Sequence, residues 1–155
     1  MLVPTAEDSY RQGIRALKER RFLEAQALFE AAVAISRKSQ HAEVQPRYLS
    51  FYGYCLGVHS NRHHEGVELC RQAIHKENYN ADLYYNLGMS LLTAGRRKEA
   101  HDALLRGFHL QPGHRDITKA LRGMGLRRRP PIPFLARANP VNVLLGRLVY
   151  GMRSR

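Results

Sequence analysis

The sequence has no long stretch of alternating apolar and polar residues, so it does not predict β-strands. No apolar run approaches the roughly 20 residues that cross a membrane as a helix. The first residues, MLVPTAEDSY, have neither a basic start nor an apolar stretch, so they do not predict a secretory signal. The 155 residues, 44% of them hydrophobic, are enough for one folded domain with a core.

Cysteine is also scarce, since the chain holds only Cys55 and Cys70. Both fall at positions where the helical pattern described below predicts burial. Two buried free thiols fit a reducing compartment, and a disulfide between them is the less favoured alternative. We therefore expect the protein to be cytoplasmic.

Motifs of catalysis and of cofactor binding are missing. There is no glycine-rich phosphate loop, no nucleophile with its base, and no carboxylate pair in a cleft-forming context. His59 and His63 have the i, i+4 spacing of a metal-binding pair, but the residues between them predict a turn and no ligand set is complete nearby. We interpret these histidines, with His64, as solvated turn residues. The sequence predicts a protein that is not an enzyme and uses no cofactor, metal or small-molecule substrate.

The chain does contain an internal repeat, which is clearest in residues 81–114. This block has apolar residues at helical spacing in each half and Pro112 near its end. Similar blocks cover about residues 6–39 and 46–80. Each block has one small residue in each half, at equivalent positions: Gly13 and Ala25, Gly53 and Gly66, and Gly88 and Ala100.

Glycine in a helix interior costs about 1 kcal/mol relative to alanine, so Gly13, Gly53 and Gly88 predict helix pairs whose backbones touch. This pattern, with a period of about 34 residues, resembles the tetratricopeptide repeat, a helix–turn–helix unit. The resemblance covers about residues 6–114. It implies an all-α, right-handed superhelical solenoid of three repeats, in which each hairpin buries its apolar stripe against the next one.

The first two blocks depart from the regular pattern. The second block starts later than the period requires, so the extra residues around 39–44 predict a longer second helix or a loop. It also needs one inserted residue, which we place in the turn around residues 59–64. The residue two positions after each glycine is expected to face the preceding hairpin. It is small in the second and third blocks (Cys55 and Ser90) and charged in the first (Arg15), where no hairpin precedes.

In the tetratricopeptide family, the first helix of each hairpin lines a concave inner face. On this chain the resemblance assigns to that face a largely aromatic and aliphatic set: Tyr10, Ile14, Leu17, Tyr54, Val58, Tyr85, Met89 and Leu92. One branch of the family binds the C-terminal carboxylate of chaperones through Lys, Asn and Arg side chains. The matching positions here contain no cation: Tyr10, Ile14, Phe51, Asp82 and Asn86. We therefore expect this groove to bind an apolar peptide segment or an amphipathic helix.

The end of the chain is basic and rich in proline. After Asp116 the sequence has nine basic residues and no acidic one. Residues 115–125 predict a short capping helix that Asp116 begins, and residues 126–155 form a tail with an amphipathic helix over about 140–152. The apolar side of that helix is expected to dock on a surface through six side chains: Val141, Leu144, Leu145, Leu148, Val149 and Met152.

Three surfaces could receive the tail helix: the chain's own repeats, a partner protein, or an anionic membrane, where each nearby basic residue contributes about 1 kcal/mol. The sequence predicts a non-enzymatic adaptor or scaffold that binds a protein or peptide partner. The alternative is a peripheral membrane- or assembly-associated factor, or a secretion-type chaperone, that uses the tail. Nucleic-acid binding is not expected, because no reading module is present and aromatic residues are not interleaved with the arginines.

Overall fold

The structure of this chain is a computed structural model that describes residues 4–39, 43–124 and 144. Residues 1–124 form one compact unit, and residues 125–155 form a second unit, in which Leu144 is the one described residue. The described part of the first unit is helical and has no strand, which confirms the prediction of an all-α chain. Its helices are α1 (Ala6–Lys18), α2 (Phe22–Lys38), α3 (Pro46–His59), α4 (His63–Lys76), α5 (Ala81–Thr93), α6 (Arg97–Leu110) and α7 (Arg115–Gly123).

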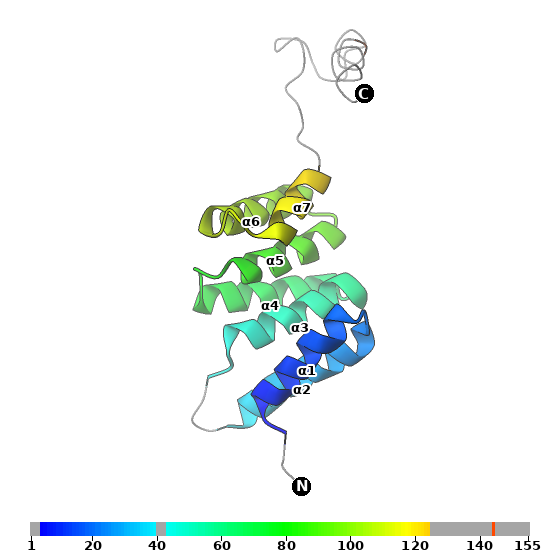
Figure 1. Cartoon of the computed structure of the whole chain (residues 1–155), viewed down its shortest axis with the longest axis vertical. Helices are drawn as coiled ribbons and strands as arrows, with labels where there is room; N and C mark the ends of the chain where they lie inside the picture. The colour runs from blue at the N-terminus through cyan, green and yellow to red at the C-terminus, as the bar shows by residue number, and fades with distance from the viewer. Residues whose placement is uncertain (1–3, 40–42, 125–143, 145–155) are drawn as a thin grey trace. The chain divides into compact units, whose positions relative to one another are not determined.

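The helices pair into three hairpins, α1 with α2, α3 with α4, and α5 with α6. The hairpins stack in chain order, and α7 packs against α6 at the end of the stack (Figure 1). The second helix of the first hairpin is the longest, with 17 residues against 14 in α4 and in α6. The connection between α2 and α3 is also longer than the one between α4 and α5, seven residues against four. The extra residues after the first block therefore lengthen both the helix and the loop, the two outcomes that the sequence predicts as alternatives.

The first helices of the hairpins begin at residues suited to a helix start. Thr5 caps α1 in a reciprocal pair with Asp8, whose backbone N–H donates to the Thr5 hydroxyl at 3.1 Å. Pro46 occupies the first turn of α3, where the missing N–H is not needed. The Asn80 side chain accepts a hydrogen bond from the backbone N–H of Asp82 at the start of α5.

The second helices share a different device, an arginine before the helix and a glutamate three residues later. Arg21, Arg62 and Arg96 have no side-chain capping bond to the backbone. Each instead forms an ion pair with its glutamate, at 2.5 Å to Glu24, 2.5 Å to Glu65 and 2.6 Å to Glu99. A carboxylate in the first turn also stabilises a helix through the helix dipole. The pair marks the start of all three second helices.

The turn inside each hairpin has a left-handed residue at its middle position. These residues are Arg20, Asn61 and Gly95, with φ of 61°, 56° and 77°. The turns are equal in length, three residues each. The inserted residue of the second block therefore lies in the last turn of α3, and the prediction that it lengthens the connecting turn is wrong.

The close contact within the second hairpin is between backbones. A Cβ atom built on Gly53 would lie 2.6 Å from the carbonyl oxygen of Gly66. Cys70 lies beside this contact, and its sulfur would be 3.0 Å from the same Cβ. No larger residue fits at either glycine without moving one helix.

In the other two hairpins the glycine lies closest to a side chain of the paired helix and not to its backbone. A Cβ on Gly13 would lie 2.6 Å from the ring of Phe29, and one on Gly88 would lie 2.6 Å from Leu104. Phe29 and Leu104 are fully buried and occupy the position that Cys70 occupies in the second hairpin. Gly13, Gly53 and Gly88 thus all lie in tight contacts between paired helices, as predicted.

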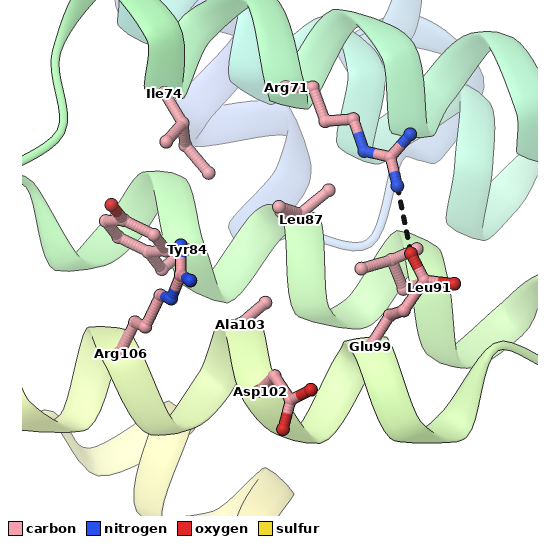
Figure 2. Close-up of a pocket in the computed structure, with 9 residues that line it drawn as sticks. All are labelled: Arg71, Ile74, Tyr84, Leu87, Leu91, Glu99, Asp102, Ala103 and Arg106. Atoms are coloured by element: carbon pink, nitrogen blue, oxygen red, sulfur yellow. Dashed lines mark hydrogen bonds and ion pairs between the residues drawn. The ribbon is translucent and has the colours of Figure 1, made fainter.

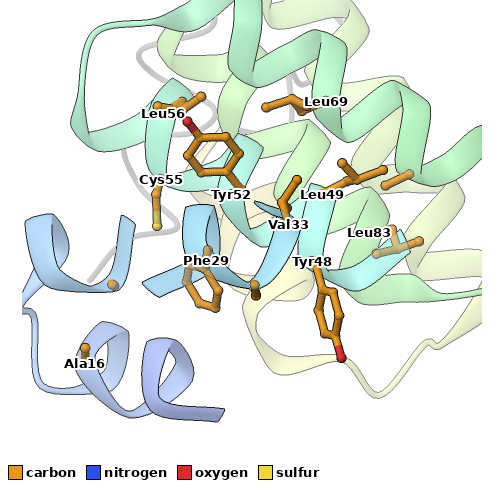
Figure 3. Close-up of a cluster of buried hydrophobic side chains, with 13 residues drawn as sticks. Ala16, Phe29, Val33, Tyr48, Leu49, Tyr52, Cys55, Leu56, Leu69 and Leu83 are labelled. Atoms are coloured by element: carbon orange, nitrogen blue, oxygen red, sulfur yellow. The ribbon is translucent and has the colours of Figure 1, made fainter. Parts of the chain in front are cut away.

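The core runs through the stack from α1 to α5 (Figure 3). Its largest fully buried side chains include Tyr48, Phe29 and Leu56. Cys55 and Ser90 are both 0% exposed, and a Cβ built on Gly57 of α3 would lie 2.8 Å from the Ser90 hydroxyl. Ser90 therefore faces the preceding hairpin, as expected.

At the first joint between hairpins α2 packs on α3, and α1 contacts α3 through aromatic rings. The Tyr10 ring of α1 lies 5.2 Å from the Tyr48 ring and 5.7 Å from the Phe51 ring, both in α3. At the next joint, α3 and α5 approach closely through the small residues Gly57 and Ser90. Rings therefore line the contact of α1 with α3, whereas α3 and α5 combine a close approach at Gly57 and Ser90 with a contact between the Tyr54 and Tyr85 rings.

Candidate functional site

The eight predicted groove residues lie on α1, α3 and α5, the first helices of the three hairpins. We call these three helices and α7 the inner helices. All eight are partly exposed, unlike the fully buried core residues on the same helices: Tyr10, Ile14, Leu17, Tyr54, Val58, Tyr85, Met89 and Leu92. We call the side of these helices that carries the eight residues the inner face.

Aromatic rings form a ladder across the inner face. The Tyr54 and Tyr85 rings lie nearly parallel, with centroids 6.2 Å apart, and connect α3 to α5. The Tyr85 ring stacks in turn on His114, before α7, at 5.8 Å. Burial raises the pKa of Tyr54 and of Tyr85, so both hydroxyls stay protonated at neutral pH. The ladder offers neutral amphipathic groups that can contact apolar side chains and also donate hydrogen bonds.

Tyr10 forms a second aromatic contact group at the start of the inner face. The Arg47 guanidinium lies 5.0 Å from the centre of the Tyr10 ring and pairs with Glu7 at 2.8 Å. Burial raises the pKa of Tyr10 to about 12. Glu7 also bonds to Arg11 and to the Tyr48 hydroxyl, and these bonds lower the pKa of its carboxyl. At this corner of the inner face, the charges of Arg47 and Glu7 are therefore paired within the chain.

A buried polar pair crosses from α3 to α5 beneath the surface. The Asn86 amide donates to the Ser50 hydroxyl at 3.0 Å, and the two residues are 2% and 0% exposed. Asn86 is the one polar residue with suitable chemistry among the positions that match the chaperone-binding branch. Its amide is committed inside the fold and does not face a ligand. Sequence reasoning did not predict this pair, because either residue alone looks like an ordinary helix-surface residue.

Of the three histidines interpreted as solvated turn residues, only His64 is exposed, and it lies in the first turn of α4. His59 ends α3 and stacks on Phe22, and its Nε2 atom is buried with no hydrogen-bond partner. His63 begins α4, and its Nδ1 lies 2.7 Å from the carbonyl oxygen of Gly57. The interpretation of His59 and His63 as solvated turn residues is wrong because the inserted residue extends α3 and brings both rings against neighbouring helices.

Two further groups could carry chemistry. Cys55 and Cys70 are free and buried, and burial raises the pKa of each thiol to about 12. Such thiols stay protonated and are poor nucleophiles at neutral pH. In the part of the chain that the structure describes, no group of three or more His, Cys, Asp or Glu side chains could hold a metal ion.

A hollow of about 280 Å³ lies between the second helices α4 and α6, with residues of α5 as its floor (Figure 2). Tyr84, Leu87 and Leu91 line the floor. The rim carries charges of both signs, and Arg71 pairs with Glu99 across it at 2.9 Å. This hollow is separate from the predicted groove, since none of the eight groove residues lines it.

The predicted capping helix and tail are described only in part. α7 begins after His114, whose ring accepts a hydrogen bond from the backbone N–H of Ile117, so the expectation that Asp116 caps the helix is wrong. The predicted docking residues Val141, Leu145, Leu148, Val149 and Met152 lie outside the described residues. Leu144 is helical and 61% exposed. None of the described helices is both long and apolar enough to span a bilayer.

Comparison with known proteins identifies the fold. No protein-family model and no curated protein sequence matches this chain. Among solved structures, the Sgt2 TPR domain from Aspergillus fumigatus aligns with a TM-score of 0.64 and 18% identity, over 79% of this chain and 78% of that one. The second TPR domain of human RPAP3 aligns with a TM-score of 0.61 and 16% identity, over 79% and 96%. PcrH aligns with a TM-score of 0.59 and 16% identity, over 80% and 97%. The chain therefore has the tetratricopeptide-repeat fold, and its seven described helices fit three tandem repeats and one further helix.

Proposed function

We propose that this protein is a non-enzymatic interaction module, an adaptor or scaffold, that binds an apolar peptide segment or an amphipathic helix on its inner face. One observation carries the proposal. The eight apolar and aromatic side chains that the repeat pattern assigns to the inner face are all partly exposed and lie on consecutive inner helices. An apolar surface that spans several elements is typical of a binding site.

Solved structures of the same fold support protein or peptide binding. The second TPR domain of human RPAP3 was solved with the HSP70 peptide SGPTIEEVD, and PcrH with the chaperone binding region of PopB. This chain is only 16% identical in sequence to each of them, so the type of ligand has to be inferred from this chain's own residues.

Those residues favour an apolar ligand over an acidic chain end. The positions that match the carboxylate-binding branch hold no cation. Asn86 is buried against Ser50. The exposed groups are Tyr54, Tyr85 and their aliphatic neighbours, which suit side chains such as leucine and methionine.

The experiment is a selection of peptides from a random display library on the full-length chain, followed by titration of the enriched peptides. The test variant is Tyr54→Ala/Tyr85→Ala, and the control is Tyr79→Ala, because Tyr79 lies outside the inner face and is 73% exposed. We expect affinity to fall at least about tenfold in the double variant, as for aromatic residues at the centre of an interface. Equal binding by the double variant and the control would place the function elsewhere.

The alternative function uses the tail. Residues 126–155 carry seven basic residues and no acid, which would attract an anionic membrane. It is tested by sedimentation with phosphatidylserine vesicles of the full chain and of a chain without residues 126–155. Binding that weakens with salt and is lost on truncation would support a peripheral membrane role.

A further inference from the structure

The second residue of each inner helix is charged. The helices α1, α3, α5 and α7 begin at Ala6, Pro46, Ala81 and Arg115. Their second residues therefore form a row at one edge of the inner face: Glu7, Arg47, Asp82 and Asp116. Three of the four are acidic, in a chain whose formal net charge is +12.

The first half of the row is neutralised within the chain. Arg47 pairs with Glu7 at 2.8 Å and lies over the ring of Tyr10, which follows Glu7 by three residues. This arrangement shows how a basic side chain binds at this edge: its charge meets the acid while its planar group lies on the tyrosine.

The second half of the row repeats the acid and the tyrosine without the arginine. Asp82 precedes Tyr85 by three residues, as Glu7 precedes Tyr10, but the next residue in the row is Asp116 where the first half has Arg47. His114 donates one hydrogen bond to Asp82 at 2.8 Å, and the Asp82 side chain remains 61% exposed. Asp116 is exposed and has no ion pair with any residue of the described ranges.

These acids lie beside the aromatic ladder. Asp82 accepts the hydrogen bond from His114, whose ring stacks on Tyr85, and Asp116 follows His114 by two residues in the first turn of α7. After burial, the charge of Asp116 is the next cause that raises the pKa of Tyr85. Acidic residues in the first turn stabilise a helix with or without a ligand, so their position alone identifies no site. Their place next to an exposed apolar surface determines the charge that a bound segment should carry.

We propose that the segment bound by the inner face carries an arginine or a lysine next to its apolar side chains, and that Asp82 and Asp116 bind this basic group. This inference rests on the proposed function and adds the charge of the ligand. The partner is thus a protein with a basic, apolar segment, whereas related domains such as that of human RPAP3 were solved with an acidic peptide.

The test uses three labelled synthetic peptides of about fourteen residues with leucines at the spacing of an amphipathic helix. They differ only in two positions, which hold arginine, glutamine or glutamate. Fluorescence anisotropy at low salt gives the affinity of each for the full-length chain. We expect the arginine peptide to bind at least about fivefold more tightly than the glutamate peptide, with a smaller difference at high salt.

Matched aspartate variants locate the effect. Asp116→Asn is expected to weaken binding of the arginine peptide about two- to fivefold and to leave binding of the glutamine peptide unchanged. Asp102→Asn is the control, since Asp102 lies at the rim of the hollow between α4 and α6. Equal effects of Asp116→Asn and Asp102→Asn, or tighter binding of the glutamate peptide, would overturn the proposal.

The outcomes also separate this inference from the proposed function. If all three peptides bind equally and Tyr54→Ala/Tyr85→Ala abolishes binding, the charge preference is wrong and the inner-face site stands. If the tyrosine variant binds all three as the wild type does, the proposed function fails as well. Self-association of the full chain that is lost in the tyrosine variant would assign the inner face to a second copy and would also overturn the proposal.

Discussion

The ring of His59 stacks on the ring of Phe22, with centroids 3.7 Å apart and planes inclined by 12°. The contact joins the end of α3 to the start of α2, across the first joint between hairpins. It exists because the residue inserted in the second block lengthens α3. The contact leaves the His59 Nε2 atom buried without a partner.

Replacing this ring by one without a nitrogen should stabilise the fold. His59→Phe keeps the stack on Phe22 and removes a buried polar atom whose desolvation costs about 1–3 kcal/mol. We expect the melting temperature to rise by several degrees in thermal unfolding. His64→Phe is the control, because His64 is exposed. An equal rise in both variants would mean that the buried nitrogen is not the cause.

The same variant should change how stability depends on pH. Burial lowers the pKa of His59 below its ordinary value of 6.5, so the unfolded chain binds this proton more readily than the folded one. The wild type therefore loses stability from this group as pH falls below about 6.5, and His59→Phe does not. Urea unfolding at pH 7.5 and 5.5 should show a smaller loss for the variant. A loss equal to that of the wild type would contradict the assignment.

The backbone contact of the second hairpin makes a sharp prediction for glycine. In Gly66→Ala the new Cβ would lie 2.5 Å from the Gly53 carbonyl oxygen and 2.5 Å from the Gly57 nitrogen, and backbone cannot move aside as a side chain can. We expect a loss of about 3 kcal/mol or more in the free energy of unfolding. Gly123→Ala has no atom within 4 Å of its new Cβ and should be neutral or stabilising by up to about 1 kcal/mol. Similar values for the two variants would show that the helices are not in contact.

Arg20 and Gly95 occupy equivalent left-handed positions in two turns, so gaining a glycine at one and losing it at the other should change stability in opposite directions. Arg20 has a φ of 61°, which costs a residue with a side chain about 1–2 kcal/mol. Arg20→Gly should therefore stabilise the protein by up to about 1 kcal/mol, after the entropy of glycine in the unfolded chain is subtracted. Gly95→Ala should destabilise it by a similar amount, because Gly95 has a φ of 77°. Chemical denaturation of both variants measures the two changes.

Acidic chain ends should not bind. We expect the peptide SGPTIEEVD to show no saturable binding to the full-length chain in an anisotropy titration, because the inner face supplies no cation at the matching positions and Asn86 is bonded to Ser50. Saturable binding that is lost when its C-terminal carboxylate is amidated would contradict this prediction.

The sequence predicted the elements that follow from the repeat period. Gly13, Gly53 and Gly88 align the hairpins, and the same alignment places the inner-face residues on the first helices. Small residues between helices are visible in sequence because glycine is costly there unless packing requires it. Exposure of the groove residues follows from the same helical phase.

The sequence did not predict features that depend on the partner of a side chain. The sequence does not fix the place of the inserted residue, because the residues around His59 suit the last turn of a helix as well as the turn between two helices. The sequence did not predict that His114 begins α7. The His114 ring is held by the ring of Tyr85 and by the carboxylate of Asp82, and both residues lie more than 25 positions away along the chain. The arginine before each second helix and the glutamate in its first turn were detectable, since Arg21 and Glu24 have counterparts at the same offset in the other blocks.

The joint between the first two hairpins has a mechanical consequence. Rings that meet at their edges, such as Tyr10 and Phe51, can slide and tilt with small rotations of their side chains, whereas the fit of Gly57 against Ser90 would have to open to allow the same movement. We therefore expect α1 to tilt on α3 more readily than α5 does, because a tilt of α5 would have to separate Gly57 from Ser90.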